Sequence, residues 1–278
     1  MADTDQLAIV RLGADDARAG LALSAEAQWN QNEADWRFFL AQGTAFGVCD
    51  HDGRLIATAA LMPYTSGNAW ISMVLVTAAW RRRGVATRLV DACLDAAAKQ
   101  GLTSWLDATP AGAKVYGALG FAPTLQLRRL RLANSALPKA AGASPRLAAG
   151  NLREFTARDN RAMGFDRGIL LAELSKRPGS RLLSDGDAMA LVRDGRKARH
   201  IGPLFAGPAD RALTLVDEIA RSETGPLLID AVGEQEEFLG GLTGAGWVFE
   251  RPFLRMRFGG APALAAEPPF AVAGPEFG

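Results

Sequence analysis

The order of predicted elements occurs twice in this chain of 278 residues. In the first half SWLDATPAGAKVYGALGF precedes LRRLRL, and in the second half PLLIDAVGEQEEFLGGLTGAGW precedes FLRMRF. Each half runs from a hairpin through a buried strand, a helix, a strand ending in Asp and a short helix to a Gly-aromatic pair and a last strand. We predict one α/β (α+β) fold used twice, each copy a mixed central sheet flanked by helices. Element order is weak support on its own, so two unrelated domains stay open as the alternative.

Two stretches of different composition divide the chain. Residues 134–150 are rich in Pro, Gly, Ala and Ser and have no hydrophobic period, which is typical of a linker. Residues 261–278 have a similar composition, and we expect them to form a disordered tail. The predicted domains are therefore residues 1–133 and residues 151–260.

Local signals predict several helix starts and turns. Asn32 is a predicted N-cap, because the apolar residues after it recur at helical spacing. Thr109 is another, and Pro110 follows it in the first turn, where proline is tolerated. His51-Asp52-Gly53 predicts the tight turn of a β-hairpin.

The composition argues against several functional classes. The formal net charge is +1, so we expect no nucleic-acid partner. No apolar run approaches the roughly 20 residues of a membrane span. The acidic start MADTDQLAIV does not resemble a targeting signal. Two cysteines without ligand spacing and two histidines predict no metal site. We expect a cytoplasmic protein that is a monomer or a homodimer.

Three adjacent arginines follow an apolar strand, in WRRRGVAT after ISMVLV. Charge at the edge of a buried strand needs a counter-charge. The first turn of the next helix has unpaired N–H groups and a dipole that favours an anion. Gly84 allows close approach, and arginine adds charge-assisted bonds. This predicts a diphosphate site, although the loop alone also fits a solvated basic surface. Its residues are Arg81, Arg82, Arg83, Gly84, Val85, Ala86 and Thr87.

With its flanking elements, this loop resembles the signature of the GNAT superfamily of acetyl-CoA-dependent N-acetyltransferases. Arg81, Gly84 and Ala86 match the family's Q/R-x-x-G-x-G/A, with alanine at the last position. Tyr116 with Gly120-Phe121 matches Y-x-x-x-G-F. LDATPAGAKVYGALGF and WNQNEADW are similar to a bacterial two-domain subgroup, and MGFDR, RHIGPLFA, LLID and RPFLRM are similar to its C-terminal GNAT-like domain.

The resemblance implies tandem GNAT-like domains that use acetyl-CoA as cosubstrate. It implies transfer of acetyl to an amine. We expect the amine of a small molecule, because a second domain packed over the first would close the groove that a peptide needs, with a silent CoA-binding regulatory protein or a protein acetyltransferase as alternatives. The second half lacks the R-x-x-G-x-G/A pattern and has Pro208 where an N–H would help. We therefore expect one acetyl-CoA site per chain, with the second domain a degenerate copy that shapes the acceptor pocket.

The resemblance also implies roles for single residues. Tyr116 is the expected acid for the leaving thiolate, although a tyrosine packed in the core gives the same pattern. The backbone of Val74, Leu75 and Val76 is expected to hold the thioester and pantetheine arm. Acceptor-site candidates are Trp29, Asn30, Gln31 and Asp107, for which core, capping or loop-fixing roles are equally open.

Further polar residues have open roles. The general base is left open among Glu26, Glu33, Asp35 and Asp107, and a water relay is a further alternative. Arg161, Asp166, Arg167, Arg251 and Arg255 are candidates to line a cleft between the domains, but ordinary surface salt bridges are favoured for each. His200 is expected to be structural.

Overall fold

The computed structural model describes residues 7–133, 147–260 and 268–278. Its first half begins with a strand and two helices, continues with a three-stranded meander, and ends with two helices that alternate with two strands. The bounds are β1 Ile9–Arg11, η2 Ala14–Asp16, α1 Ala17–Glu26, α2 Glu33–Gln42, β2 Thr44–Cys49, β3 Leu55–Tyr64, β4 Asn68–Val76, η3 Ala78–Trp80, α3 Val85–Ala98, β5 Thr103–Ala108, α4 Pro110–Ala118 and β6 Ala122–Leu132.

The second half repeats the strands and α-helices of the first in the same order. The predicted linker lies mostly outside the described residues, but its last part contains a short strand. Helices α5 and α6 and strand β8 have no counterpart in the sequence prediction. The bounds are β7 Ala148–Ala149, α5 Leu152–Met163, α6 Gly168–Lys176, β8 Arg181–Asp185, β9 Ala188–Arg193, β10 Arg199–Phe205, α7 Ala209–Ser222, β11 Leu227–Val232, α8 Glu236–Gly244 and β12 Val248–Phe258.

All these strands join one sheet of twelve, in the order β1-β2-β3-β4-β5-β12-β6-β11-β10-β9-β8-β7. The pairs β4–β5 and β10–β11 are parallel, and the other neighbouring strands are antiparallel. The predicted mixed α/β fold is therefore confirmed. Of the helices in the described ranges, none is long and apolar enough to cross a bilayer.

Two predicted caps are confirmed. Asn32 Oδ1 accepts a hydrogen bond from Asp35 N–H at 3.1 Å, and Asp35 Oδ2 accepts one from Asn32 N–H at 2.9 Å. Thr109 Oγ1 accepts a bond from Gly112 N–H at 3.2 Å. These side chains satisfy N–H groups that the first turns of α2 and α4 leave unpaired, so the sequence fixes where both helices begin.

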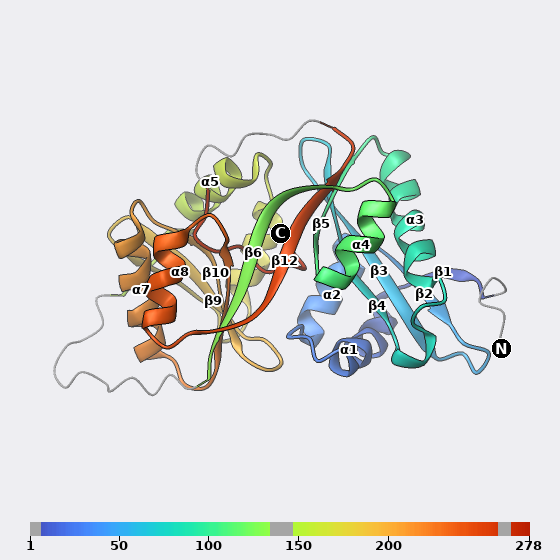
Figure 1. Ribbon diagram of the computed structural model, residues 1–278, viewed down its shortest axis with the longest axis horizontal. Helices are drawn as coiled ribbons and strands as arrows, with labels where there is room; N and C mark the ends of the chain where they lie inside the picture. The colour runs from blue at the N-terminus through green and yellow to red at the C-terminus, as the bar shows by residue number, and fades with distance from the viewer. Residues whose placement is uncertain (1–6, 134–146, 261–267) are drawn as a thin grey trace.

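The last strand of each half lies in the other half of the sheet. Strand β12 pairs with β5, strand β6 pairs with β11, and the two exchanged strands pair with each other in the middle (Figure 1). Neither half therefore completes its part of the sheet without a strand from the other.

Two buried ion pairs hold the exchanged strands in the same register. Arg255 on β12 lies opposite Asp107 on β5, and Arg129 on β6 lies opposite Asp230 on β11. Each arginine makes two parallel hydrogen bonds to its carboxylate, at 2.9 Å in the first pair and 2.8 Å in the second. Both pairs are almost excluded from solvent, so a shift of one residue in either strand would leave two charges buried without a partner.

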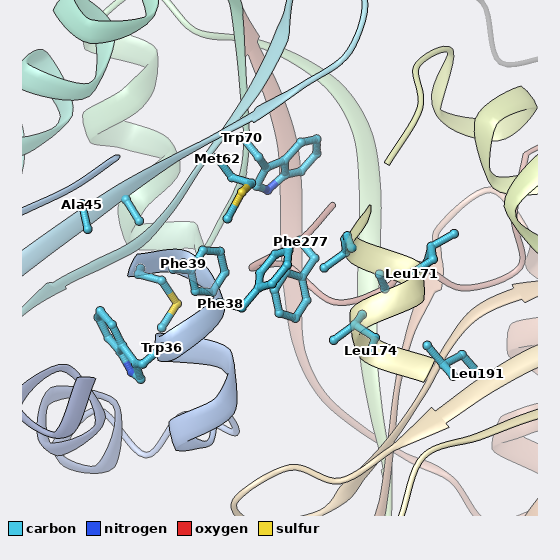
Figure 2. Close-up of a cluster of buried hydrophobic side chains, with 14 of the residues drawn as sticks. Trp36, Phe38, Phe39, Ala45, Met62, Trp70, Leu171, Leu174, Leu191 and Phe277 are labelled. Carbon is cyan, nitrogen blue, oxygen red and sulfur yellow. The ribbon is translucent and has the colours of Figure 1, made fainter. Parts of the chain in front are cut away.

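One apolar core spans both halves. Phe277 stacks on Phe39 of α2, with ring centroids 5.1 Å apart, and meets Phe38 edge-on. The same cluster continues to Leu171 and Leu174 of α6, as Figure 2 shows. Phe277 therefore joins the core of the first half to that of the second.

The expectation of a disordered tail is wrong for residues 268–278, which we call the inner segment, while residues 261–267 lie outside the described residues. Phe270 and Phe277 anchor it in apolar clusters, and Ala271 and Ala273 between them are fully buried. Small side chains let a backbone pass through a packed interior. The richness in Pro, Gly and Ala, from which we predicted disorder, here belongs to a buried segment.

We expect Arg255→Met to lower the free energy of unfolding by about 3–5 kcal/mol, because Asp107 would stay buried without its partner. Changing both residues, in Asp107→Leu with Arg255→Met, should cost less than the single change. Urea denaturation followed by circular dichroism measures both. As a control, Arg54→Met should change stability by less than about 0.5 kcal/mol, because the Arg54 side chain is 79% exposed. An Arg255→Met variant as stable as the unmodified protein would contradict the account.

Candidate active site

The first half contains a cavity where two parallel strands separate. Strands β4 and β5 pair only through Asn68–Trp70 and Thr103–Trp105. Beyond these pairs a cavity opens between the strands. It is lined by Trp29, Gln31, Ile71, Ser72, Met73, Val74, Leu106, Asp107, Ala108, Thr109, Tyr116, Arg129, Arg251, Phe253, Pro275 and Glu276.

A bulge in β4 accompanies the separation. Met73 has a positive φ of 54°, and the register between β3 and β4 shifts between Thr58 and Ala60. Thr58 Oγ1 donates to the Met73 carbonyl at 2.8 Å, which fixes the bulge from inside the sheet. A bulge bends its strand and redirects its backbone groups. The edge of β4 that faces β5 beyond Trp70 has no strand partner in the described part of the chain.

The arginine loop follows β4 directly. Arg81 Nε donates to the Val76 carbonyl at 3.0 Å, so the loop folds back on the end of the strand. Arg82 and Gly84 have φ of 59° and 76°. Gly84 is the N-cap of α3, and this left-handed conformation favours glycine. Arg81, Arg82, Arg83 and Gly84 are all exposed.

Helix α3 begins without a side-chain cap. Asn32, Thr109 and Asn151 cap α2, α4 and α5 with their side chains, whereas Gly84 has none to offer. The first-turn N–H groups of α3, from Val85 to Thr87, are therefore left for solvent or an anion. This arrangement fits the phosphate groups of a nucleotide cofactor.

Tyr116 reaches the cavity from α4, with its ring beside Phe121 at a centroid distance of 6.0 Å. Burial raises the pKa of the Tyr116 phenol to about 12. The phenol is therefore protonated at neutral pH and can serve as a proton donor.

Asp107 lines the cavity, but Arg255 holds both of its oxygens. Burial raises the pKa of the Asp107 carboxyl, although the guanidinium of Arg255 acts in the opposite direction. Arg255 in turn lies over the ring of Trp70, 4.6 Å from its centroid. The position of Asp107 is therefore set by the strand exchange.

The structure separates the residues of the predicted acceptor segment. Trp29 and Gln31 line the cavity, but Asn30 does not. Asn30 Oδ1 accepts from the N–H groups of Lys197 and Ala198, and its Nδ2 donates to the Ala198 carbonyl. Asn30 thus holds the first half to the β9–β10 loop of the second half.

Of the four carboxylates left open as general base, only Asp107 lines the cavity. Glu26 accepts from the Ala78 N–H at 2.7 Å, beside the arginine loop. Glu33 pairs with Arg37 on α2. Asp35 belongs to the cap of α2 and also pairs with Arg177.

The expectation of ordinary surface salt bridges is wrong for two arginines. Arg167 is buried and bonds both oxygens of Asp159, and Arg255 is buried on Asp107. Arg251 lines the cavity. His200 is buried with Nε2 2.9 Å from Asp230, and its pKa is lowered by burial and by Arg193. The described residues contain no group of three His, Cys, Asp or Glu that could hold a metal ion.

In the second half, the inner segment fills the place that corresponds to the cavity. Strands β10 and β11 pair in parallel only as far as Ile201 and Ile229. Beyond them, Ala271 bridges Leu204 on β10 and Ala231 on β11. Leu204 N–H donates to the Ala271 carbonyl at 3.0 Å. The chain's own backbone thus occupies the gap that is open between β4 and β5.

The inner segment then continues to the cavity of the first half, where Pro275 and Glu276 form part of its wall. The sequence prediction missed both residues because it placed them in a disordered tail. The available signal was the pair of phenylalanines, Phe270 and Phe277, in a stretch otherwise made mostly of small residues. Aromatic residues of this kind usually mark a buried segment.

Both tyrosines of the chain should ionise only at high pH, because burial raises the pKa of Tyr64 as well as that of Tyr116. We expect little tyrosinate absorbance from the folded protein at pH 10, whereas the urea-unfolded chain should be about half ionised there. The raised pKa of Tyr116 makes a contribution to the free energy of unfolding that is complete below about pH 10, the ordinary pKa of tyrosine. This contribution is lost as the pH rises towards 12, the pKa in the folded protein. The part of the absorbance change that disappears in Tyr116→Phe belongs to Tyr116. Ionisation of the tyrosines of the folded protein near pH 10 would contradict their burial.

Two family models match this chain. The Acetyltransferase (GNAT) family model matches residues 15–121, and an Acetyltransferase (GNAT) domain model matches residues 156–267. YitH, an uncharacterised N-acetyltransferase of Bacillus subtilis (strain 168), is 24% identical over 235 residues, which are 81% of this chain and 82% of that protein.

Solved structures share the fold at low identity. A candidate acetyltransferase from Pyrococcus horikoshii has a TM-score of 0.80 at 18% identity, over 97% of this chain and 95% of that one. A tandem GNAT protein from the clavulanic acid biosynthesis pathway has a TM-score of 0.66 at 15% identity, over 93% of this chain and all (100%) of that one. With a GNAT model on each half and the same elements in each, this chain belongs to the GNAT acetyltransferase family as a tandem member and is an acyltransferase.

Proposed function

We propose that this enzyme moves an acetyl group from acetyl-CoA to an amine of a small molecule, in the cavity between β4 and β5. The observation that carries the proposal is the separation of these strands after Trp70 and Trp105. It leaves an unpaired backbone edge, Tyr116 and several polar side chains around one space. GNAT enzymes use acetyl-CoA as cosubstrate, so the cofactor class follows from the family.

The arginine loop is the proposed site of the coenzyme's diphosphate. The uncapped first turn of α3 offers N–H groups, and Gly84 adopts the left-handed conformation that exposes them. Arg81, Arg82 and Arg83 are exposed beside this turn. Helix α7 begins after Pro208, which has no N–H, and has Asp210 in its first turn. These features, with the filled gap between β10 and β11, support one coenzyme site per chain.

The reaction needs a neutral amine, a polarised thioester carbonyl and a proton for the leaving thiolate. The unpaired backbone near Val74, Leu75 and Val76 is the proposed donor to the carbonyl. Tyr116 lines the same cavity with a protonated phenol and is the proposed acid. Each transfer forms an N–C bond, breaks a C–S bond, and releases one proton when the acceptor enters as an ammonium ion.

The walls of the cavity favour a small acceptor. Its lining comes from both halves of the chain, including Arg251 and Phe253 of β12 and Pro275 of the inner segment. A peptide acceptor needs an open groove for extended backbone. Here the second half and the inner segment lie where such a groove would continue.

Isothermal titration with acetyl-CoA tests the coenzyme site. We expect one saturable site per chain. Loss of a hydrogen bond to a charged group costs about 1.5–3 kcal/mol, so Arg81→Ala should weaken binding roughly tenfold or more. Gly84→Glu should abolish it, since it adds negative charge and strains a φ of 76°. Arg37→Ala, at an exposed arginine on α2, should bind as the unmodified protein does. No saturable binding, or binding unaffected by either loop change, refutes the proposal.

Tyr116→Phe tests the acid. We expect kcat to fall by about 10²–10⁴, the usual range for a general acid, with the affinity for acetyl-CoA unchanged. Release of free thiol from acetyl-CoA, measured over a panel of amines and amino sugars, gives the rate. If the variant turns over at the rate of the unmodified protein, Tyr116 is not the acid and contributes only to packing.

A further inference from the structure

The inner segment brings one acidic side chain, Glu276, to the wall of the cavity. Glu276 Oε1 accepts a hydrogen bond from Arg193 Nη2 at 2.8 Å. Its Oε2 is buried and has no hydrogen-bond partner among the described residues. A buried carboxylate oxygen without a donor is unfavourable, because it has lost water and gained nothing in return. A donor that entered the cavity would remove this cost.

Two more residues of the wall have a buried oxygen that can accept a hydrogen bond, and the Ser72 hydroxyl can also donate one. Gln31 Oε1 and Ser72 Oγ are buried and lack hydrogen-bond partners in the described part of the chain. The charged side chains beside them are already paired. Asp107 is bound by Arg255, Arg129 is bound by Asp230, and Arg251 is bound by Glu250. These pairs leave Glu276 Oε2 and Gln31 Oε1 as buried acceptors without a donor among the described residues.

We propose that Glu276, with Gln31 and Ser72, binds the ammonium group of the acceptor and thereby selects primary amines. This inference rests on the proposed function in one respect, that the cavity is the acceptor site. An ammonium group offers three N–H donors and a positive charge, whereas a hydroxyl offers one donor and no charge. The bond to Glu276 is charge-assisted, and the site discriminates because an alcohol would leave buried acceptors unpaired.

The rest of the wall indicates the body of the acceptor. Trp29, Phe253 and Pro275 contribute apolar surface. Apolar walls with a few polar groups are typical of sites for compact ligands. A primary amine on a short apolar or aromatic body fits this combination, and phenethylamine is a suitable probe. Phenethyl alcohol has the same shape without the charge.

The experiment measures dissociation constants of both probes by isothermal titration, with the full chain alone and with coenzyme A. We expect the unmodified protein to bind phenethylamine roughly 100-fold more tightly than phenethyl alcohol. Glu276→Gln should weaken the binding of phenethylamine roughly tenfold or more, and should leave the binding of the alcohol and of acetyl-CoA unaffected. Glu276→Asp, which keeps the charge, should restore part of the loss.

Two further variants keep the test decisive. Glu173 lies on α6 and its side chain is 45% exposed, so Glu173→Gln should change the dissociation constant of neither probe. Gln31→Leu leaves the Arg193–Glu276 pair intact and should still weaken phenethylamine several-fold, so it replaces Glu276→Gln if that variant does not fold. The proposal is overturned if the unmodified protein does not bind phenethylamine more tightly than phenethyl alcohol. It is also overturned if the Glu276 and Gln31 variants that fold bind phenethylamine as tightly as the unmodified protein does. A failure of acetyl-CoA to bind refutes the proposed function instead.

Discussion

Two buried arginine–carboxylate pairs are the contacts on which the rest of the structure depends. Arg255–Asp107 and Arg129–Asp230 occupy equivalent positions in the two halves, each between an exchanged last strand and a strand of the other half. Because each pair is bidentate and nearly without solvent, it tolerates one register only. The same register brings Arg129, Arg251 and Phe253 to the wall of the cavity. The strand exchange is thus what brings residues of the second half into the candidate active site of the first half.

The inner segment closes in the second half the gap that is open in the first half. In each half two parallel strands separate after three pairs of residues. In the second half, the backbone around Ala271 fills the gap and bonds to Leu204, so the strand edge has the partner that β4 lacks. These contacts hold the inner segment in place, and from there the chain continues through Gly274 to Glu276. The segment that fills the gap of the second half therefore also supplies part of the cavity wall of the first half.

Local features of the fold were predictable because their causes are local. Asn32 and Thr109 cap helices through residues three positions away, and the loop before α3 uses Gly84 for a backbone conformation that favours glycine. The repeat was readable because matched strands keep matched patterns. The exchange of β6 and β12 was not readable, since either partner strand offers the same alternation and an Asp opposite an Arg. The inner segment was missed because small residues are typical both of disorder and of tight burial.

The candidate acceptor site follows from the same non-local contacts. Trp29 and Gln31 were predicted from their segment, and the neighbouring Asn30 is instead bound to the backbone of Ala198. That contact holds the β9–β10 loop, and β9 carries Arg193, which orients Glu276. If the proposed acceptor site is correct, a substitution that weakens the contact between Asn30 and the β9–β10 loop would alter acceptor binding without touching the cavity. Under the proposed function, acceptor specificity depends on how the halves are joined, whereas coenzyme binding depends on a loop and helix that one half contains by itself.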